Sequence, residues 1–133
     1  MYIVIDFNSD EAIYMQLRNQ IIMGIATEQI KEGDALPSVR QLADEIGINM
    51  HTVNKAYSVL RQEGFIKLDR RKGAVICLEL DKLVAMEELS DAMKVVVARA
   101  MCKNISRQEM HNILDIVIDG FSASGTERNQ QYE

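Results

Sequence analysis

Two short helices separated by a three-residue turn constrain the fold of this chain more than any other feature of its sequence. Ser38 begins the first helix, and Gln41 three positions later completes the S-x-x-Q pattern of a capping box. The first helix should end at Gly47, because glycine adopts the left-handed conformation of a helix C-terminus without strain. Asn49 caps the second helix, which should end at Gly64. This spacing is typical of a helix-turn-helix motif.

Each of the two helices carries an apolar stripe that predicts which face is buried. The stripe of the first helix comprises Val39, Leu42, Ala43 and Ile46. The stripe of the second helix comprises Val53, Ala56, Tyr57 and Leu60. The opposite face of the second helix is polar and comprises His51, Asn54, Lys55, Ser58, Arg61 and Gln62. The second helix should therefore pack on a core with one face and offer hydrogen-bonding and cationic groups with the other.

A β-hairpin with a basic tip is predicted after the second helix. Residues 65–68 and 74–78 are short apolar runs that read as strands, and Asp69-Arg70-Arg71-Lys72-Gly73 joins them. The whole chain has a net charge of −5, but residues 37–76 hold seven basic and four acidic side chains. The excess of cations is thus concentrated in the helix pair and the hairpin, as a surface that faces phosphates requires.

The segments on either side of this motif are predicted to be mostly helical. Residues 2–7 should form a short strand or an apolar arm, and a helix is expected from Glu11 to near Lys31. Beyond the hairpin, a long amphipathic helix should end at Asn104. Ser106 and Glu109 then form a second capping box, which begins the last helix.

The predicted fold class is mostly α with a small β-hairpin wing. Residues 1–78 should form a winged helix-turn-helix domain that binds DNA, and residues 79–133 a helical dimerisation region whose tail is disordered from Ser122. Two helices with wide apolar faces cannot hide both faces without a third layer, so we expect a symmetric homodimer through this region. The expected interface residues are Leu83, Met86, Met93, Val97, Ile113, Val117 and Phe121.

Candidate DNA contacts follow from the way a helix-turn-helix motif approaches a duplex. The N-terminal turn of the second helix reaches base edges and phosphates, and its positive dipole end favours a phosphate. Arg40 can lie against the backbone or bind a guanine edge, and the basic hairpin tip suits the adjacent minor groove. The candidate contacts are Ser38, Arg40, Asn49, His51, Thr52, Asn54, Lys55, Arg70, Arg71, Lys72 and Gly73.

Some of these candidates also have a simpler interpretation. Arg40 can form a surface ion pair with Asp44 one helical turn later. His51 can be an exposed polar residue with no function, and the cations of residues 70–72 can be merely solvated at the end of a hairpin.

One sequence pattern runs through residues 36–76 without a gap. It consists of P-S-x-R-x-L-A, then G-I-N-x-x-T-V-x-x-A-Y-x-x-L, then E-G, and it ends with the basic wing and its glycine. It resembles the DNA-binding domain of the GntR family of bacterial regulators, and the short C-terminal region resembles the YtrA-type subfamily. The resemblance implies a repressor that binds a palindromic operator of an ABC-transporter operon. It makes Arg40, Thr52 and Arg71 to Gly73 the main contacts.

The sequence departs from the family pattern at three places. Met50 stands where relatives often have arginine or proline, and Asn54 and Lys55 stand where arginine is frequent at one or the other. Ala74-Val75 replaces the usual Thr-Phe after the wing glycine. The first two departures affect the expected operator sequence rather than the fold.

The sequence leaves other functions open. The main alternative is a ligand-gated sensor in which a small apolar effector enters between the arm and the DNA-binding domain, near Met86, Met93, Met101 and Met110. A winged helix that makes only protein contacts conflicts with the basic wing. We expect no enzyme, because nucleophile motifs and phosphate loops are missing. We expect no cofactor and no metal, because the cysteines and histidines lack ligand spacing.

The sequence also predicts where the protein acts. It has no apolar run near the roughly 20 residues that span a bilayer, and its N-terminus lacks the features of a signal peptide. We therefore expect a cytoplasmic protein with no membrane partner.

Overall fold

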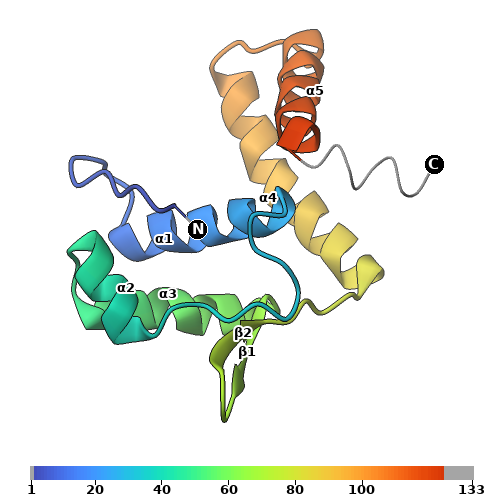
Figure 1. The fold of residues 1–133 in the computed structure, drawn as a ribbon. Helices are drawn as coiled ribbons and strands as arrows, with labels where there is room; N and C mark the ends of the chain where they lie inside the picture. Colours follow the sequence, from blue (N-terminus) through green and yellow to red (C-terminus); the bar gives the residue numbers. More distant parts are fainter. Residues whose placement is uncertain (1, 125–133) are drawn as a thin grey trace. The chain divides into compact units, whose positions relative to one another are not determined.

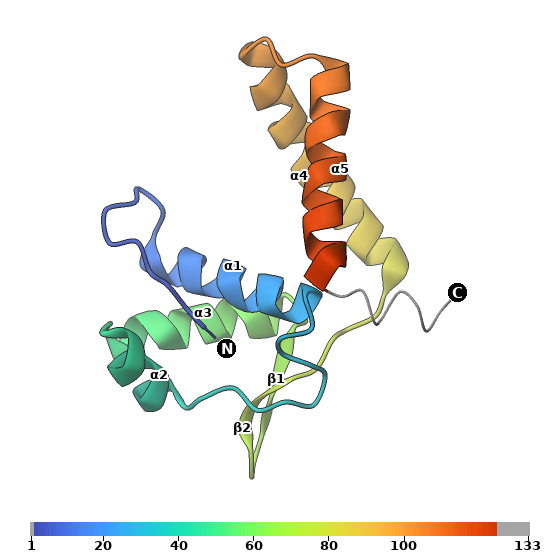
Figure 2. The same ribbon diagram turned by 45° about the horizontal axis from the view of Figure 1, so that its top comes forward.

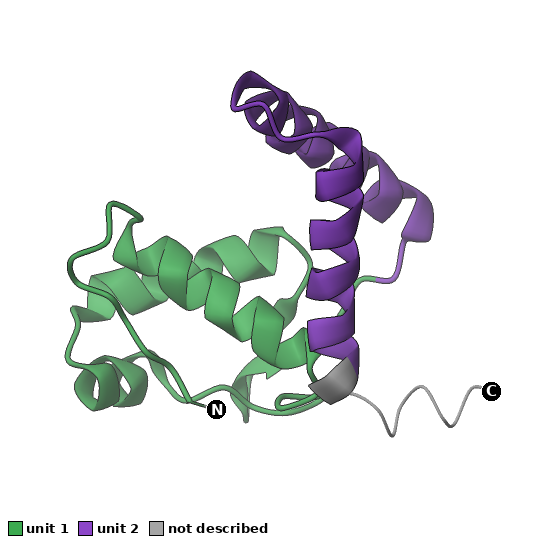
Figure 3. Ribbon diagram, turned by 90° about the horizontal axis from the view of Figure 1, so that it is seen from above, with its two compact units in different colours: residues 1–79 green, residues 80–133 purple. Residues whose placement is uncertain are grey.

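The computed structural model describes residues 2–124, and it divides into two compact units, residues 1–79 and 80–133 (Figure 3). The first unit contains α1 (Ile13–Ala26), α2 (Val39–Ile46), α3 (Met50–Gln62), β1 (Ile66–Asp69) and β2 (Gly73–Ile76) (Figure 1). The second unit contains α4 (Lys82–Cys102) and α5 (Arg107–Ser124). The predicted fold class, mostly α with one β-hairpin and two C-terminal helices, is confirmed. The tail predicted to be disordered from Ser122 begins later than expected, because residues 122–124 still belong to α5. The rest of that predicted tail lies outside the described residues.

The first helix is shorter than the sequence pattern predicted, because tertiary packing decides where it ends. It begins at Ile13 instead of Glu11 and ends at Ala26 instead of near Lys31. After Ala26 the chain turns back, and the N–H groups of residues 29 and 30 both donate to the carbonyl of Gly24. Ile30 is thereby buried against Gly24, where an added Cβ atom would lie 3.0 Å from Ile30 Cδ1. The helix therefore ends at Ala26, because turning back there buries Ile30 against Gly24, which a further helical turn would not do.

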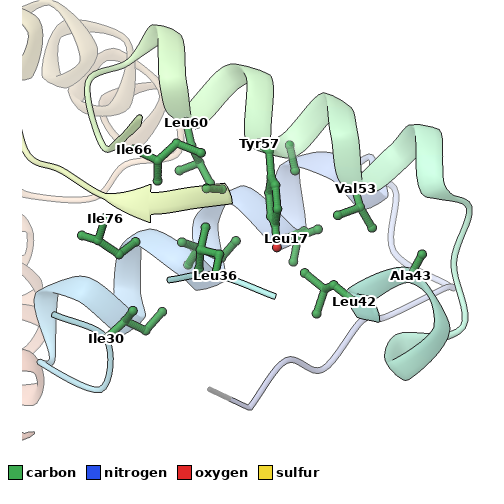
Figure 4. Close-up of a cluster of buried hydrophobic side chains, with 13 residues drawn as sticks. Leu17, Ile30, Leu36, Leu42, Ala43, Val53, Tyr57, Leu60, Ile66 and Ile76 are labelled. Carbon is green, nitrogen blue, oxygen red and sulfur yellow. The ribbon is translucent and has the colours of Figure 1, made fainter. Parts of the chain in front are cut away.

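The core of the first unit lies between the three helices and the hairpin. The predicted apolar stripes of α2 and α3 supply part of it, because Leu42, Val53 and Leu60 are almost fully buried. Leu17 and Ile21 of α1 are also fully buried. Figure 4 shows side chains from α3, α2 and the chain before α2 meeting in one cluster. The core therefore fixes the positions of α2 and α3 from behind and leaves their other faces to solvent.

The hairpin pairs with a third segment of chain. β1 and β2 are antiparallel, with Ile66 opposite Ile76 and Asp69 opposite Gly73, and the hairpin extends away from α1, α2 and α3 (Figure 2). The residues before α2 run along the other edge of β2. There the N–H of Leu36 donates to the carbonyl of Ala74 at 2.8 Å, and Ala35 bridges to Val75. The segment that leads into α2 is therefore attached to the hairpin.

The N-terminal residues form an arm and not a strand of a sheet. Gln16 and Gln20 lie one helical turn apart on α1, and their side-chain amides form the backbone hydrogen bonds that a neighbouring strand would otherwise form. The Gln20 amide oxygen accepts from the N–H of Val4 at 2.9 Å, and the Gln16 amide oxygen accepts from the N–H of Asp6 at 2.9 Å. The Gln16 amide nitrogen donates back to the Asp6 carbonyl at 3.0 Å. Of the two possibilities that the sequence left open, the apolar arm is correct.

Among residues 80–122, whose burial the structure describes, no side chain of the second unit is buried in one copy of the chain. Asp81 caps α4, and Ser106 and Glu109 form the predicted capping box at the start of α5. The turn between them contains Asn104 with φ of 60°, where the sequence predicted the break. No residue of α4 is buried, and apolar side chains such as Leu83 (78% exposed) and Ile116 (70% exposed) face solvent.

Candidate nucleic-acid interface

The outer face of α3 is defined here as His51, Asn54, Ser58, Arg61 and Gln62, all of which are exposed. The opposite face supplies the buried residues of the helix, so the outer face is directed away from the core. It contains no carboxylate. Such a face can approach a polyanion without like-charge repulsion, and its amide, imidazole and guanidinium groups can form hydrogen bonds with base edges or phosphates.

Two of the predicted contact residues are helix caps. The hydroxyl oxygen of Ser38 accepts from the N–H of Gln41 at 3.1 Å, and the Gln41 side chain accepts from the N–H of Ser38 at 3.3 Å. The amide oxygen of Asn49 accepts from the N–H of His51 at 2.7 Å. These bonds fix the first turns of α2 and α3, the turns that should meet DNA. The N–H of Thr52 bonds to the Asn49 carbonyl, and the Thr52 side chain is half-buried.

Arg40 lies in the first turn of α2 and is exposed. In the structure Arg40 does not form the ion pair with Asp44 that the simpler interpretation predicted. Within residues 2–124 the ion pairs join Arg18 to Glu63 and Lys94 to Asp91. Arg40 is therefore available to bind an anion in solution.

A shallow depression of 600 Å³ brings three of the predicted residues together. Asn49, His51 and Asn54 line it with Val39 and Met50, so it lies where α2 and α3 both begin. The structure does not place Lys55 there. Its ammonium group lies 4.0 Å from the ring centroid of Tyr14 on α1, a cation–π contact worth about 0.5–1 kcal/mol at an exposed site.

The wing, meaning β1, β2 and their tip, ends in three exposed cations, Arg70, Arg71 and Lys72. One carboxylate oxygen of Asp69 holds the tip, because it accepts from the backbone N–H of Arg71 at 2.8 Å and of Lys72 at 3.0 Å. These two bonds, with smaller contributions from the charges of Lys72 and Lys67, hold the pKa of Asp69 below its ordinary value. Gly73 closes the tip with φ of 76°, a left-handed conformation that favours glycine.

Comparison with known families decides what this combination of elements is. The family model described as bacterial regulatory proteins, gntR family, matches residues 10–76, about half of the chain. The chain belongs to the GntR family. A curated relative, the HTH-type transcriptional repressor YtrA of Bacillus subtilis, is 32% identical over 112 residues, which is 82% of this chain and 86% of the relative.

Solved structures of similar proteins agree with this assignment. YtrA from Sulfolobus acidocaldarius, a GntR-family transcription factor, is 40% identical, with 89% of this chain and 97% of that chain covered and a TM-score of 0.56. A structure described as a transcriptional antiterminator from Listeria monocytogenes has 26% identity, a TM-score of 0.81 and coverage of 91% and 92%. This GntR-family chain is a helix-turn-helix transcriptional regulator of the YtrA type. The proteins it resembles are transcription factors and not enzymes.

Sequence reasoning missed two residues that shape the surface of this GntR regulator. The sequence places Asp69 only in the hairpin tip, although an aspartate at the start of a turn often accepts a hydrogen bond from the backbone two residues later. Tyr57 was assigned to the apolar core. The structure buries its ring, but its hydroxyl donates to the carbonyl of Pro37 at 2.7 Å. No periodicity in the sequence indicates that bond.

In the part of the chain that the structure describes, no helix is long and apolar enough to cross a membrane.

Proposed function

We propose that this regulator binds operator DNA with the start of α2, the outer face of α3 and the wing. Of the predicted contacts, Ser38, Arg40, Asn49, His51, Asn54, Arg70, Arg71, Lys72 and Gly73 belong to these elements or the turns beside them. Thr52 and Lys55 lie on α3 outside its outer face, because Thr52 is half-buried and the ammonium group of Lys55 lies over the Tyr14 ring. The observation that carries the proposal is the exposed, carboxylate-free face of α3 beside three exposed cations at the wing tip. Cations beside hydrogen-bonding groups supply both the affinity for phosphates and the reading of bases.

Arg40 provides the sharpest test of this surface. An Arg40→Ala variant should bind operator DNA about 5- to 150-fold more weakly, because a bidentate arginine–guanine pair contributes about 1–3 kcal/mol. Arg99→Ala is the matched control, because Arg99 is also an exposed arginine and lies on α4. Fluorescence anisotropy with a duplex selected by the native protein from a random-sequence pool measures both. Native affinity in Arg40→Ala would reject the assigned surface.

The apolar faces of α4 and α5 support a homodimer. Leu83, Met86, Ile113 and Val117 of the predicted interface are 78%, 57%, 53% and 48% exposed in one copy. Met93, Val97 and Phe121 complete the predicted set. Such exposure over two helices costs free energy in water and is relieved when an identical face covers it. A symmetric dimer would present two wings and two α3 helices, which fits a palindromic operator.

The dimer proposal has a test within α5. Ile113→Glu with Val117→Glu places two carboxylates on the apolar face and should convert the dimer to a monomer in analytical ultracentrifugation. Gln108→Glu with Asn112→Glu adds the same charges with the same spacing on the polar face, where those two residues bond to each other. A dimer that survives the first pair, or dissociates equally with the second, contradicts the proposed interface.

The direction of regulation is proposed from relatives. The Bacillus relative is named a repressor, and on that basis we infer that this chain represses the genes beside its operator. An ABC-transporter operon remains the expected target from the resemblance to the YtrA type. A reporter fused to the chain's own promoter should become more active when the gene is deleted, and the neighbouring genes identify the operon.

A ligand-gated sensor is the second candidate, and one observation favours it, although at a site within the second unit and not between the arm and the DNA-binding domain, where the sequence placed the effector. Within the second unit a groove of 420 Å³ is lined by apolar side chains that include Met93, Met101 and Met110, with Arg107 and His111 beside them. Its volume is in the range that binds small molecules. Native mass spectrometry of the purified protein tests this candidate. A bound compound that disappears in Met110→Arg supports a sensor, whereas an empty dimer favours the partner chain as the cover of the groove.

A further inference from the structure

Tyr57 connects the recognition helix to the chain in front of α2. It projects from the middle of α3, and its ring is 6% exposed within the core cluster, with the oxygen at its far end (Figure 4). The hydroxyl donates to the carbonyl oxygen of Pro37, twenty residues earlier, at 2.7 Å. Burial raises the pKa of this phenol far above its ordinary value, so the donor stays protonated at any physiological pH.

The Pro37 carbonyl lies just outside the hydrogen bonds of α2. The first bonds of that helix go to Ser38, whose carbonyl accepts from Leu42 and whose hydroxyl accepts from Gln41. The position of Pro37 is therefore not set by the helix itself. A group outside α2 has to set it, and Tyr57 does so from α3.

The same segment is held on its other side by the wing. The N–H of Gly33 donates to the Ile76 carbonyl at 2.8 Å, and the N–H of Ile76 donates to the Asp34 carbonyl at 2.9 Å. The N–H of Leu36 donates to the Ala74 carbonyl at 2.8 Å. Residues 33–37 are thus attached to β2 through the backbone and to α3 through one phenol, and Arg40 follows three residues later.

We propose that the Tyr57 hydroxyl is a positioning group for DNA binding, which holds the start of α2, and Arg40 with it, in register with α3 and the wing. This inference rests on the proposed function. Tyr57 is buried, so it does not touch DNA itself. It determines whether Arg40, the outer face of α3 and the wing tip can reach one duplex at the same time, as tight binding requires.

A phenylalanine separates this positioning from packing. Tyr57→Phe keeps the ring in the core and removes only the bond to Pro37. Tyr14→Phe is the matched control, because it also removes one tyrosine hydroxyl while the ring that faces Lys55 remains. Affinity is measured with the full chain and the duplex selected from a random pool. Tyr57→Phe should weaken binding about 3- to 10-fold, the equivalent of about one hydrogen bond, and Tyr14→Phe should not.

A double-mutant cycle with Arg40→Ala distinguishes positioning from a general loss of stability. If Tyr57 acts through Arg40, the two losses are not independent, and Arg40→Ala should cost several-fold less in the Tyr57→Phe background than in the native chain. Hydrogen exchange should also accelerate at Gln41 and Leu42, whose N–H groups bond to Ser38, and not in α1. Binding is measured at a temperature where all variants show native circular dichroism.

Several results of these experiments would overturn the positioning role of Tyr57. Equal costs of Arg40→Ala in both backgrounds, or native affinity in Tyr57→Phe, overturn the positioning role. A Tyr57→Phe chain that does not fold at any temperature also overturns it, because the hydroxyl would then serve stability. Failure of the native chain to select any duplex rejects the proposed function itself, which is a separate result.

Discussion

Neutralising the wing tip is the perturbation whose effect on DNA binding can be worked out most directly from the structure. Arg70→Gln, Arg71→Gln and Lys72→Gln together remove three exposed cations. The tip should keep its shape, because Asp69 holds it through the backbone N–H groups of residues 71 and 72 and not through their side chains. The change therefore alters charge and leaves the surface otherwise intact.

The magnitude follows from the release of counterions. Each phosphate contact contributes about 0.9 to the slope of log affinity against log salt, so three lost contacts lower the slope by up to about 2.7 per subunit. In 50 mM salt the variant should bind much more weakly than the native chain. As salt rises the two affinities should converge, because the lost term is electrostatic.

Anisotropy titrations of the selected duplex between 50 mM and 400 mM salt measure the slope. The matched control replaces three exposed cations of the second unit, Lys82, Arg99 and Lys103, with glutamine and changes the net charge equally. The reasoning would be refuted by an unchanged slope in the wing variant. It would also be refuted by an equal drop in the control, because the slope would then report the net charge of the protein and not wing contacts.

Three further predictions concern the scaffold behind this surface. Gly64→Ala should destabilise the fold by more than Gly47→Ala, since both glycines have positive φ but only at Gly64 would the new Cβ crowd a neighbour, the Glu79 Cβ atom at 3.1 Å, which cannot rotate away as the carboxylate can. Thermal denaturation compares them, with about 1–2 kcal/mol expected for the backbone conformation alone, and equal losses would contradict the steric argument. Because the folded-state pKa of Asp69 is depressed, the wing tip should be fully ordered above the ordinary aspartate pKa and should lose this order as the pH falls through the depressed value. Amide NMR shifts at residues 71 and 72 should follow this transition, and the Asp69→Asn variant should not show it. Gln16→Ala should release the N-terminal arm, seen as faster hydrogen exchange at Asp6, whereas exchange at Val4, held by Gln20, should change less.

The features that the sequence predicted correctly are mostly local ones. Ser38 with Gln41, Asn49, and Ser106 with Glu109 cap their helices in the structure as the spacing indicated, because a cap involves only neighbours in the chain. The apolar stripes of α2 and α3 also place the correct residues in the core.

The features that the sequence could not predict depend on contacts that do not follow the regular spacing of one helix or strand. The end of α1 is set by Ile30 packing on Gly24, and nothing in the periodicity of the helix contains that information. The position of Lys55 over Tyr14 and the bond from Tyr57 to Pro37 each join two elements whose relative placement is known only after folding. Within the candidate interface, residue chemistry was therefore predictable and the direction of individual side chains was not.

The second unit has a consequence for how the regulator responds to its own abundance. A 21-residue helix with no buried side chain gains little by forming alone in water, and the proposed dimer would supply the missing contacts. If two copies supply each other's missing core, the melting temperature of this unit will rise with protein concentration. At low protein concentration, monomers would then have an unstable second unit, and each could bind only one half-site of the operator. Dimers that bind both half-sites would form only as the protein concentration rises. Operator binding would thus rise steeply above a threshold concentration of the protein, because the second unit completes its core only in the dimer.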